Sequence, residues 1–127
     1  MESVKGNILI VEHEAIIALD IKKRFENFGY NIVNTIPSIE DIFANLHSYK
    51  GVDLILLDSE TSDFSQRMST LERIYRSLRT PLILFISKND ENIRAKCEKY
   101  DTIRVIEKPF NDKELMDAVA NIIKDVN

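Results

Sequence analysis

The sequence contains little cysteine, glycine or proline, and each scarcity excludes a class of protein. A single cysteine, Cys97, cannot form an internal disulfide and fits a reducing compartment. Three glycines and three prolines leave little room for a loop-rich or all-β architecture, and no glycine-rich phosphate loop is present. No apolar run approaches membrane-spanning length. We therefore expect a cytoplasmic protein that neither crosses nor binds a membrane.

Net positive charge is also lacking. The formal net charge of -4 argues against a general affinity for nucleic acid. The hydrophobic fraction of 44% and the charged fraction of 30% are ordinary for a globular protein. Glu12, His13 and Glu14 interrupt the first apolar segment, so we do not expect a signal peptide. One compositional texture over 127 residues predicts a single domain, with its core from about residue 6 to 126.

Short apolar runs alternate with helical patterns along the chain, which predicts five β-α units. The expected strands are Asn7–Val11, Asn31–Thr35, Asp53–Leu57, Leu82–Ile86 and Ile103–Ile106. The expected helices are Glu12–Phe28, Ser38–Tyr49, Asp63–Leu78, Asn89–Tyr100 and Asn111–Val126. Such alternation favours a parallel sheet with helices on both faces. The runs NILIV, LILL and LILFI are apolar throughout, as in strands covered on both sides, whereas the alternating polarity of the last strand suits an edge.

Two helix starts carry capping signals. Ser38 is followed by Asp41 three residues later, and Asn111 is followed by Glu114 at the same spacing. Both patterns predict side-chain caps at the first turn of a helix.

Polar side chains follow four of the expected strands. Glu12 and His13 follow the first, Asp58 the third, Ser87 the fourth and Lys108 the fifth. The carboxyl edge of an open α/β sheet is where ligands and chemistry gather. Taken singly, an aspartate or serine after a strand is more often a turn or cap residue, and a lysine is more often a solvated charge.

Four segments that occur in order along the chain favour a functional role for these residues: ILIVEHE, LILLD, LILFIS and IEKPF. Each ends an expected strand, and together they span nearly the whole chain. This arrangement resembles the receiver domain of two-component response regulators, of the CheY-like superfamily. The resemblance implies a flavodoxin-like (βα)5 three-layer sandwich, with a five-stranded parallel sheet of order 2-1-3-4-5.

The resemblance also implies roles for individual residues. Asp58 matches the phosphoacceptor, which receives a phosphoryl group from a sensor histidine kinase or phosphotransfer protein. Lys108 matches the lysine that pairs with that group, and Ser87 the hydroxyl that turns toward it. Pro109 matches a proline that is usually cis. The implied partners are the kinase and a fused or separate output domain, and receivers often form homodimers through the fourth helix, fifth strand and fifth helix.

The implied metal site departs from the family pattern. Receivers hold Mg²⁺ with two adjacent carboxylates, the phosphoacceptor and a backbone carbonyl, here Glu12, His13, Asp58 and Glu60. An imidazole at position 13 is a poor ligand for a hard cation and suits Zn²⁺, Ni²⁺ or Cu²⁺ better. Mg²⁺ affinity is then lowered or lost, unless the remaining oxygens and water hold the ion weakly. A protonated His13 could instead attract a phosphoryl oxygen, or His13 could be a loop residue without a role. Glu14 is expected to point elsewhere from the helix start.

The expected switch position also departs, because Val105 stands where receivers have a tyrosine or phenylalanine. Valine is stiff at χ1 and has no ring to rotate. Lys88 replaces a small residue beside the phosphoacceptor. Two functions follow: a phosphorylated receiver, or a pseudo-receiver that acts as a phosphorylation-independent interaction module. An enzyme acting on a phosphorylated metabolite is not expected, since no substrate-binding insertion is evident.

Overall fold

The computed structural model describes residues 4–58, 64–87 and 90–126. Five parallel strands form one sheet in the order β2-β1-β3-β4-β5. The strands are β1 (Asn7–Val11), β2 (Asn31–Ile36), β3 (Leu54–Asp58), β4 (Leu82–Ile86) and β5 (Ile103–Glu107). The helices are α1 (Ala15–Asn27), α2 (Glu40–Ala44), the 3-10 helix η1 (Leu46–Tyr49), α3 (Phe64–Ser77), α4 (Glu91–Cys97) and α5 (Asp112–Val126). The flavodoxin-like fold and strand order expected from the sequence are confirmed.

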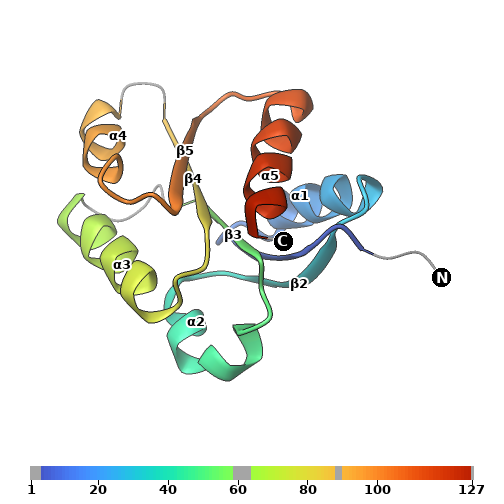
Figure 1. Cartoon of the computed structure of the whole chain (residues 1–127), viewed down its shortest axis with the longest axis horizontal. Coiled ribbons are helices and arrows are strands. Elements are labelled where there is room, and N and C mark those ends of the chain that lie inside the picture. The colour runs from blue at the N-terminus through green and yellow to red at the C-terminus, as the bar shows by residue number, and fades with distance from the viewer. Residues whose placement is uncertain (1–3, 59–63, 88–89, 127) are drawn as a thin grey trace.

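Helices cover both faces of the sheet, with α1 and α5 on one face and α2, α3 and α4 on the other (Figure 1). Alternate side chains of each central strand enter opposite layers because the side-chain period of a strand is two. In β1, Leu9 and Val11 pack in one apolar cluster, while Ile8 and Ile10 pack in the other. Each of these four side chains is at most 3% exposed. The continuous apolar runs therefore reflect burial on both faces, as predicted.

The strand register brings the ends of the central strands together. Val11 of β1 pairs with Leu57 of β3, and Asp58 pairs with Phe85 of β4. Glu107, the last residue of β5, pairs with Ile86. The residues that follow these positions therefore share one edge of the sheet. β5 pairs with β4 alone and is only partly buried, so its predicted edge position is correct.

The expected helix Ser38–Tyr49 is divided in the structure. Asn45, with φ −136° and ψ 43°, separates α2 from η1. Ile39 occupies the N-cap of α2 and no side chain caps the helix, so the predicted Ser38 cap is wrong. Asp41 N–H instead donates to the backbone carbonyl of Ser38 over 3.2 Å. Hydrogen bonds of backbone turns within this segment pair N–H and C=O groups that would have been paired inside a longer helix.

Other helix boundaries also differ from expectation, most of all the start of α1 and the end of α4, and one cap is confirmed. α1 begins at Ala15 rather than Glu12, because Glu12 N–H donates to the carbonyl of Ile36 over 2.9 Å and extends the β1–β2 pairing. α4 ends at Cys97 instead of Tyr100. At α5, Glu114 N–H donates to Asn111 Oδ1 over 2.8 Å, as the capping pattern predicts.

Cys97 is buried in the cluster under α3 and α4 and forms no disulfide. Within the described ranges, no helix is both long enough and apolar enough to traverse a bilayer.

Candidate functional site at the carboxyl edge of the sheet

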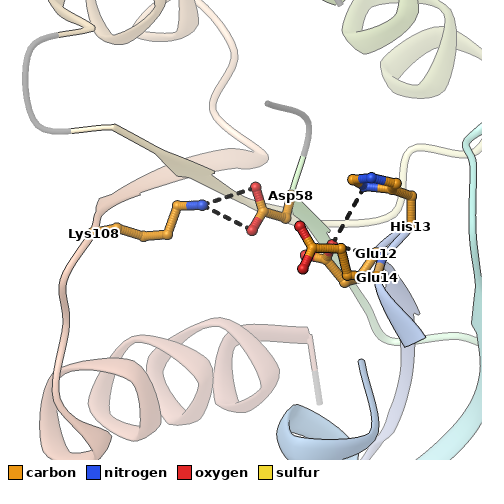
Figure 2. A network of polar contacts seen from close by, with 5 residues as sticks. All are labelled: Glu12, His13, Glu14, Asp58 and Lys108. Carbon is orange, nitrogen blue, oxygen red and sulfur yellow. Dashed lines mark hydrogen bonds and ion pairs between the residues drawn. The ribbon is translucent and has the colours of Figure 1, made fainter. Parts of the chain in front are cut away.

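The carboxyl edge of the sheet brings together charged residues from three strand ends. Figure 2 shows Asp58 between Lys108 on one side and Glu12, with its neighbours His13 and Glu14, on the other. Asp58 ends β3, Glu12 follows β1, and Lys108 follows β5. These residues are far apart in the sequence, so the parallel order of the strands alone places them in one site.

Lys108 binds both oxygens of Asp58. Its Nζ lies 3.1 Å from Oδ1 and 2.9 Å from Oδ2 of the carboxylate. The two side chains are 29% and 12% exposed, so solvent screens their attraction only in part. Lys108 N–H donates to the carbonyl of Ile86 over 2.8 Å, which fixes its backbone against β4. The peptide bond between Lys108 and Pro109 is cis, as the resemblance implied.

Glu12 is a buried acid whose carboxylate is only half satisfied. The residue is 6% exposed. Its Oε1 accepts a hydrogen bond from Glu14 N–H over 3.1 Å, whereas Oε2 has no hydrogen-bond partner within the described parts of the chain. Burial raises the pKa of Glu12, and the nearby Asp58 carboxylate raises it further, while the Glu14 N–H and His13 lower it. When both acids are ionised, Asp58 offers Glu12 another acceptor rather than a donor.

The expectation that Glu14 points away from the site is wrong. Ligand atoms of Glu12, His13 and Glu14 all lie within 4.8 Å of one another. His13 Nδ1 is 3.7 Å from Glu12 Oε1, and the His13 side chain is 58% exposed. Glu14 is the N-cap of α1, and its extended backbone keeps it in the strand-to-helix turn. The helix therefore starts too late to carry Glu14 away.

This donor set does not match the all-oxygen ligands that Mg²⁺ prefers. His13 offers imidazole nitrogen, and both oxygens of Asp58 already accept from Lys108. Glu60, whose carbonyl the resemblance adds to the metal site, lies outside the described residues, as does Lys88. The unpartnered Oε2 of Glu12 is nevertheless an oxygen that a cation could satisfy.

Ser87 and Val105 occupy different environments. Ser87 is exposed at the end of β4, and its carbonyl accepts from Asp90 N–H over 3.2 Å. It lines a cleft that also reaches Asp58 and Lys108. Val105 is partly buried and packs against the cluster under α3 and α4. Ser87 therefore lines the same cleft as Asp58. Val105, a residue of β5, instead packs against the apolar core.

The cleft beside Asp58 has a volume of about 510 Å³. The side chains that line it come from α1, the ends of β3 and β4, and the turn before α5: Ile17, Asp20, Ile21, Arg24, Asp58, Phe85, Ser87, Lys108, Pro109 and Phe110. Phe85 and Phe110 stack with their ring centroids 4.9 Å apart and form an apolar surface within it. The cleft thus joins a charged end to an apolar wall.

Sequence reasoning gave Arg24 no role at the site, although this exposed residue of α1 lines the cleft. Its guanidinium reaches Asp20 over 3.1 Å and Asp112 over 3.2 Å, so it joins α1 to the start of α5. Helical spacing alone also does not show which apolar residues of α1 are buried. Ile16 is 84% exposed and Leu19 is 50% exposed. Their spacing separates the two faces only once the buried Ala18 and Phe25 are known.

The parallel sheet has the strand order β2-β1-β3-β4-β5, and an aspartate and a lysine pair at its carboxyl edge. Comparison with known protein families identifies the class of protein that has these features. The sequence model of the response regulator receiver domain matches residues 8–120. The chain belongs to the response regulator receiver family.

The chain has low sequence identity to individual proteins of known sequence. The chain is 27% identical over 103 residues to the phyllosphere-induced regulator PhyR of Methylorubrum extorquens, covering 81% of this chain and 38% of that protein. It is 24% identical over 119 residues to ycf29 of Porphyra purpurea, covering 92% of this chain and 56% of that protein. The chain thus spans well under two thirds of either relative. A crystal structure of a response regulator from Thermotoga maritima has the same fold, with a TM-score of 0.77, 22% identity and coverage of 94% and 98%.

Proposed function

We propose that Asp58 accepts a phosphoryl group from a sensor histidine kinase or phosphotransfer protein, and that this modification changes the binding of a partner. The observation that carries the proposal is the contact of Lys108 Nζ with both Asp58 oxygens at the mouth of a cleft. A carboxylate held by one cation keeps lone pairs for attack, because each oxygen can accept more than one hydrogen bond.

The proposed reaction exchanges one bond to phosphorus for another. An Asp58 oxygen attacks the phosphorus of a phosphohistidine, an O–P bond forms, and the P–N bond breaks as the imidazole leaves and takes up a proton. Lys108 lies where its charge can stabilise the phosphoryl oxygens during transfer. Ser87 adds a hydroxyl at the same cleft. No other described cation is paired with Asp58.

Exposed apolar side chains beside the cleft suit a docking donor. Ile17 lines the cleft, and Ile16 and Leu19 on the same helix are 84% and 50% exposed. Apolar contacts around a polar centre are typical of protein interfaces. We propose that the phosphodonor binds across α1 in the cytoplasm. The greater length of the relatives supports a fused or separate output domain.

Phosphorylation is tested with a small-molecule donor. The protein is incubated with acetyl phosphate in separate samples containing Mg²⁺, Mn²⁺ or Zn²⁺, and its intact mass is measured. We expect the mass of one phosphoryl group to be added to wild type and to Asp117→Asn, which removes an exposed carboxylate on α5. Asp58→Asn should not be labelled. Absence of labelling with every ion, or labelling of Asp58→Asn, would contradict the proposal.

A phosphorylation-independent interaction module is the second candidate, and the partly buried position of Val105 favours it. Val105 is held in the packed interior and offers no aromatic ring at the surface. In amide NMR spectra, acetyl phosphate should shift resonances of β4 and β5 if Asp58 is a switch. Labelling of Asp58 without change beyond its immediate neighbours would favour the interaction module instead.

The proposed homodimer face already contains an ion pair within the chain. Arg94 of α4 lies 3.1 Å from Glu107 of β5. We propose that a dimer through α4, β5 and α5 would bring this ion pair to the interface between copies. Sedimentation velocity with and without acetyl phosphate tests this, and a single monomer boundary in both samples would exclude the dimer.

A further inference from the structure

The turn between β1 and α1 holds three metal-binding groups in consecutive positions. Carboxylate oxygens of Glu12 and Glu14 and a ring nitrogen of His13 lie within 4.8 Å of one another. Two ligands of a tetrahedral Zn²⁺ ion lie about 3.3 to 3.6 Å apart, because Zn–N and Zn–O bonds are about 2.0 to 2.2 Å long. His13 and Glu14 are exposed, so small side-chain rotations can close this gap.

A second observation indicates that the group lacks a ligand. Glu12 Oε2 is buried and has no hydrogen-bond partner within the described residues. A buried acceptor without a partner destabilises the protein, and does so more strongly when it is charged. The side chain of Glu12 is 4% exposed, so bulk water does not replace that partner. The neighbouring Asp58 offers Glu12 only another acceptor when both acids are ionised, whereas a cation bound to the Glu12 carboxylate would supply the missing positive partner.

The chemistry of the donors selects the class of ion. We propose that Glu12, His13 and Glu14 bind a borderline divalent transition-metal ion, such as Zn²⁺, in preference to Mg²⁺. Mg²⁺ prefers oxygen ligands in near-octahedral geometry, whereas imidazole together with carboxylate is an ordinary ligand set for Zn²⁺. Three protein ligands leave one position of a tetrahedral ion open to water.

Asp58 interacts with Glu12 but is not one of the three proposed ligands. Its two oxygens face Lys108, while the three donors lie on the other side of the carboxylate (Figure 2). The proposed ion can therefore bind while the Asp58–Lys108 pair stays intact. The inference goes beyond the proposed phosphorylation and holds whether or not Asp58 accepts a phosphoryl group.

Calorimetric titration with Zn²⁺ in excess Mg²⁺ is the first test. Wild type should bind one ion, and His13→Ala should lower its affinity at least about tenfold, since one of three protein ligands is lost. The matched control is His47→Ala, which removes the second of the two histidines and lies in η1. It should bind like wild type. Equal binding by wild type and His13→Ala, or a loss confined to His47→Ala, would overturn the proposal.

Two further measurements identify the ligands. Glu14→Gln should weaken Zn²⁺ binding while its circular dichroism matches wild type, because Glu14 is exposed. His13→Asp should reverse the preference by raising Mg²⁺ affinity and lowering Zn²⁺ affinity, since it replaces nitrogen by oxygen. Co²⁺ should give visible absorption bands without a thiolate charge-transfer band. A thiolate band would place the ion at Cys97, and unchanged Mg²⁺ affinity in His13→Asp would contradict the assigned ligand; either result would sink the inference.

Discussion

Lys108 and Asp58, 50 residues apart in sequence, form a two-pronged contact in which one ammonium serves both carboxylate oxygens, at 2.9 and 3.1 Å. The lysine offsets the charge of an acid that lies beside a second, buried acid, Glu12. This contact therefore supports the fold as well as the proposed chemistry.

Replacing Lys108 by methionine should destabilise the protein. Asp58 and Glu12 would then repel each other without a neighbouring cation, and the free energy of unfolding should fall by about 1 kcal/mol at neutral pH, between the values for surface and buried pairs. Urea denaturation measures the change. Lys113→Met, which removes an exposed ion pair with Asp117, is the control and should leave the stability unchanged. Equal decreases in the free energy of unfolding of both variants would show that the Lys108–Asp58 contact stabilises the protein no more than an exposed ion pair does.

The buried Glu12 predicts a pH dependence of stability. Burial raises its pKa above the ordinary value of 4.5 in the folded protein. The folded state then binds more protons than the unfolded state just above that value, so Glu12 makes stability fall as pH rises through this window. Glu12→Gln should be more stable than wild type at neutral pH, and this difference should shrink below pH 4.5.

Urea denaturation of the two proteins across this pH range tests the sign. Glu26→Gln, on the exposed face of α1, is the matched control and should follow wild type at every pH. If Glu12→Gln is less stable than wild type at neutral pH, the ionised carboxylate contributes favourable contacts that outweigh its burial.

The cap of α5 should contribute measurably to stability. Asn111 Oδ1 accepts the Glu114 N–H, and loss of such a cap typically costs about 1 kcal/mol. Asn111→Ala should therefore lower the midpoint of thermal unfolding. Asn121→Ala, at an exposed position inside the same helix, should raise it slightly because alanine has the higher helix propensity. A neutral Asn111→Ala would show that water replaces the side-chain cap.

Ile16 should be dispensable for folding. It is 84% exposed, so Ile16→Ala should change the free energy of unfolding by at most about 0.5 kcal/mol. The fully buried Ile93 of α4 provides the contrast, since its truncation to alanine should cost about 2 to 5 kcal/mol. Denaturant titrations of both variants give the comparison. A large loss at Ile16 would mean that it packs within the chain and is not available to a partner.

The strands and their order could be predicted from the sequence, but several local features could not. Every residue of a continuous apolar run such as LILFI must be buried, so such a strand must be covered on both faces of the sheet. This requirement can be recognised from the residue types alone. Given parallel strands, the proximity of Asp58 and Lys108 follows from topology. The break at Asn45 does not, because a short helix is decided by packing and turn geometry more than by periodicity.

The candidate site was anticipated in part. Helical periodicity was extended back to Glu12, although backbone pairing with Ile36 keeps this residue in the sheet. That shift of the helix start is what retains Glu14 beside His13. The position of Arg24 depended on α5, whose approach to α1 no local pattern encodes.

Arg24 places in the wall of the cleft a cation that carboxylates of the chain already bind. Its guanidinium is already held by one carboxylate from its own helix, Asp20, and by another from α5, Asp112. An anion that enters the cleft must compete with these two carboxylates for the guanidinium, even though the five N–H donors of arginine leave some free for it. Weakly charged ligands would lose that competition, and a ligand that won it would also loosen the tie between the two helices that cover this face of the sheet.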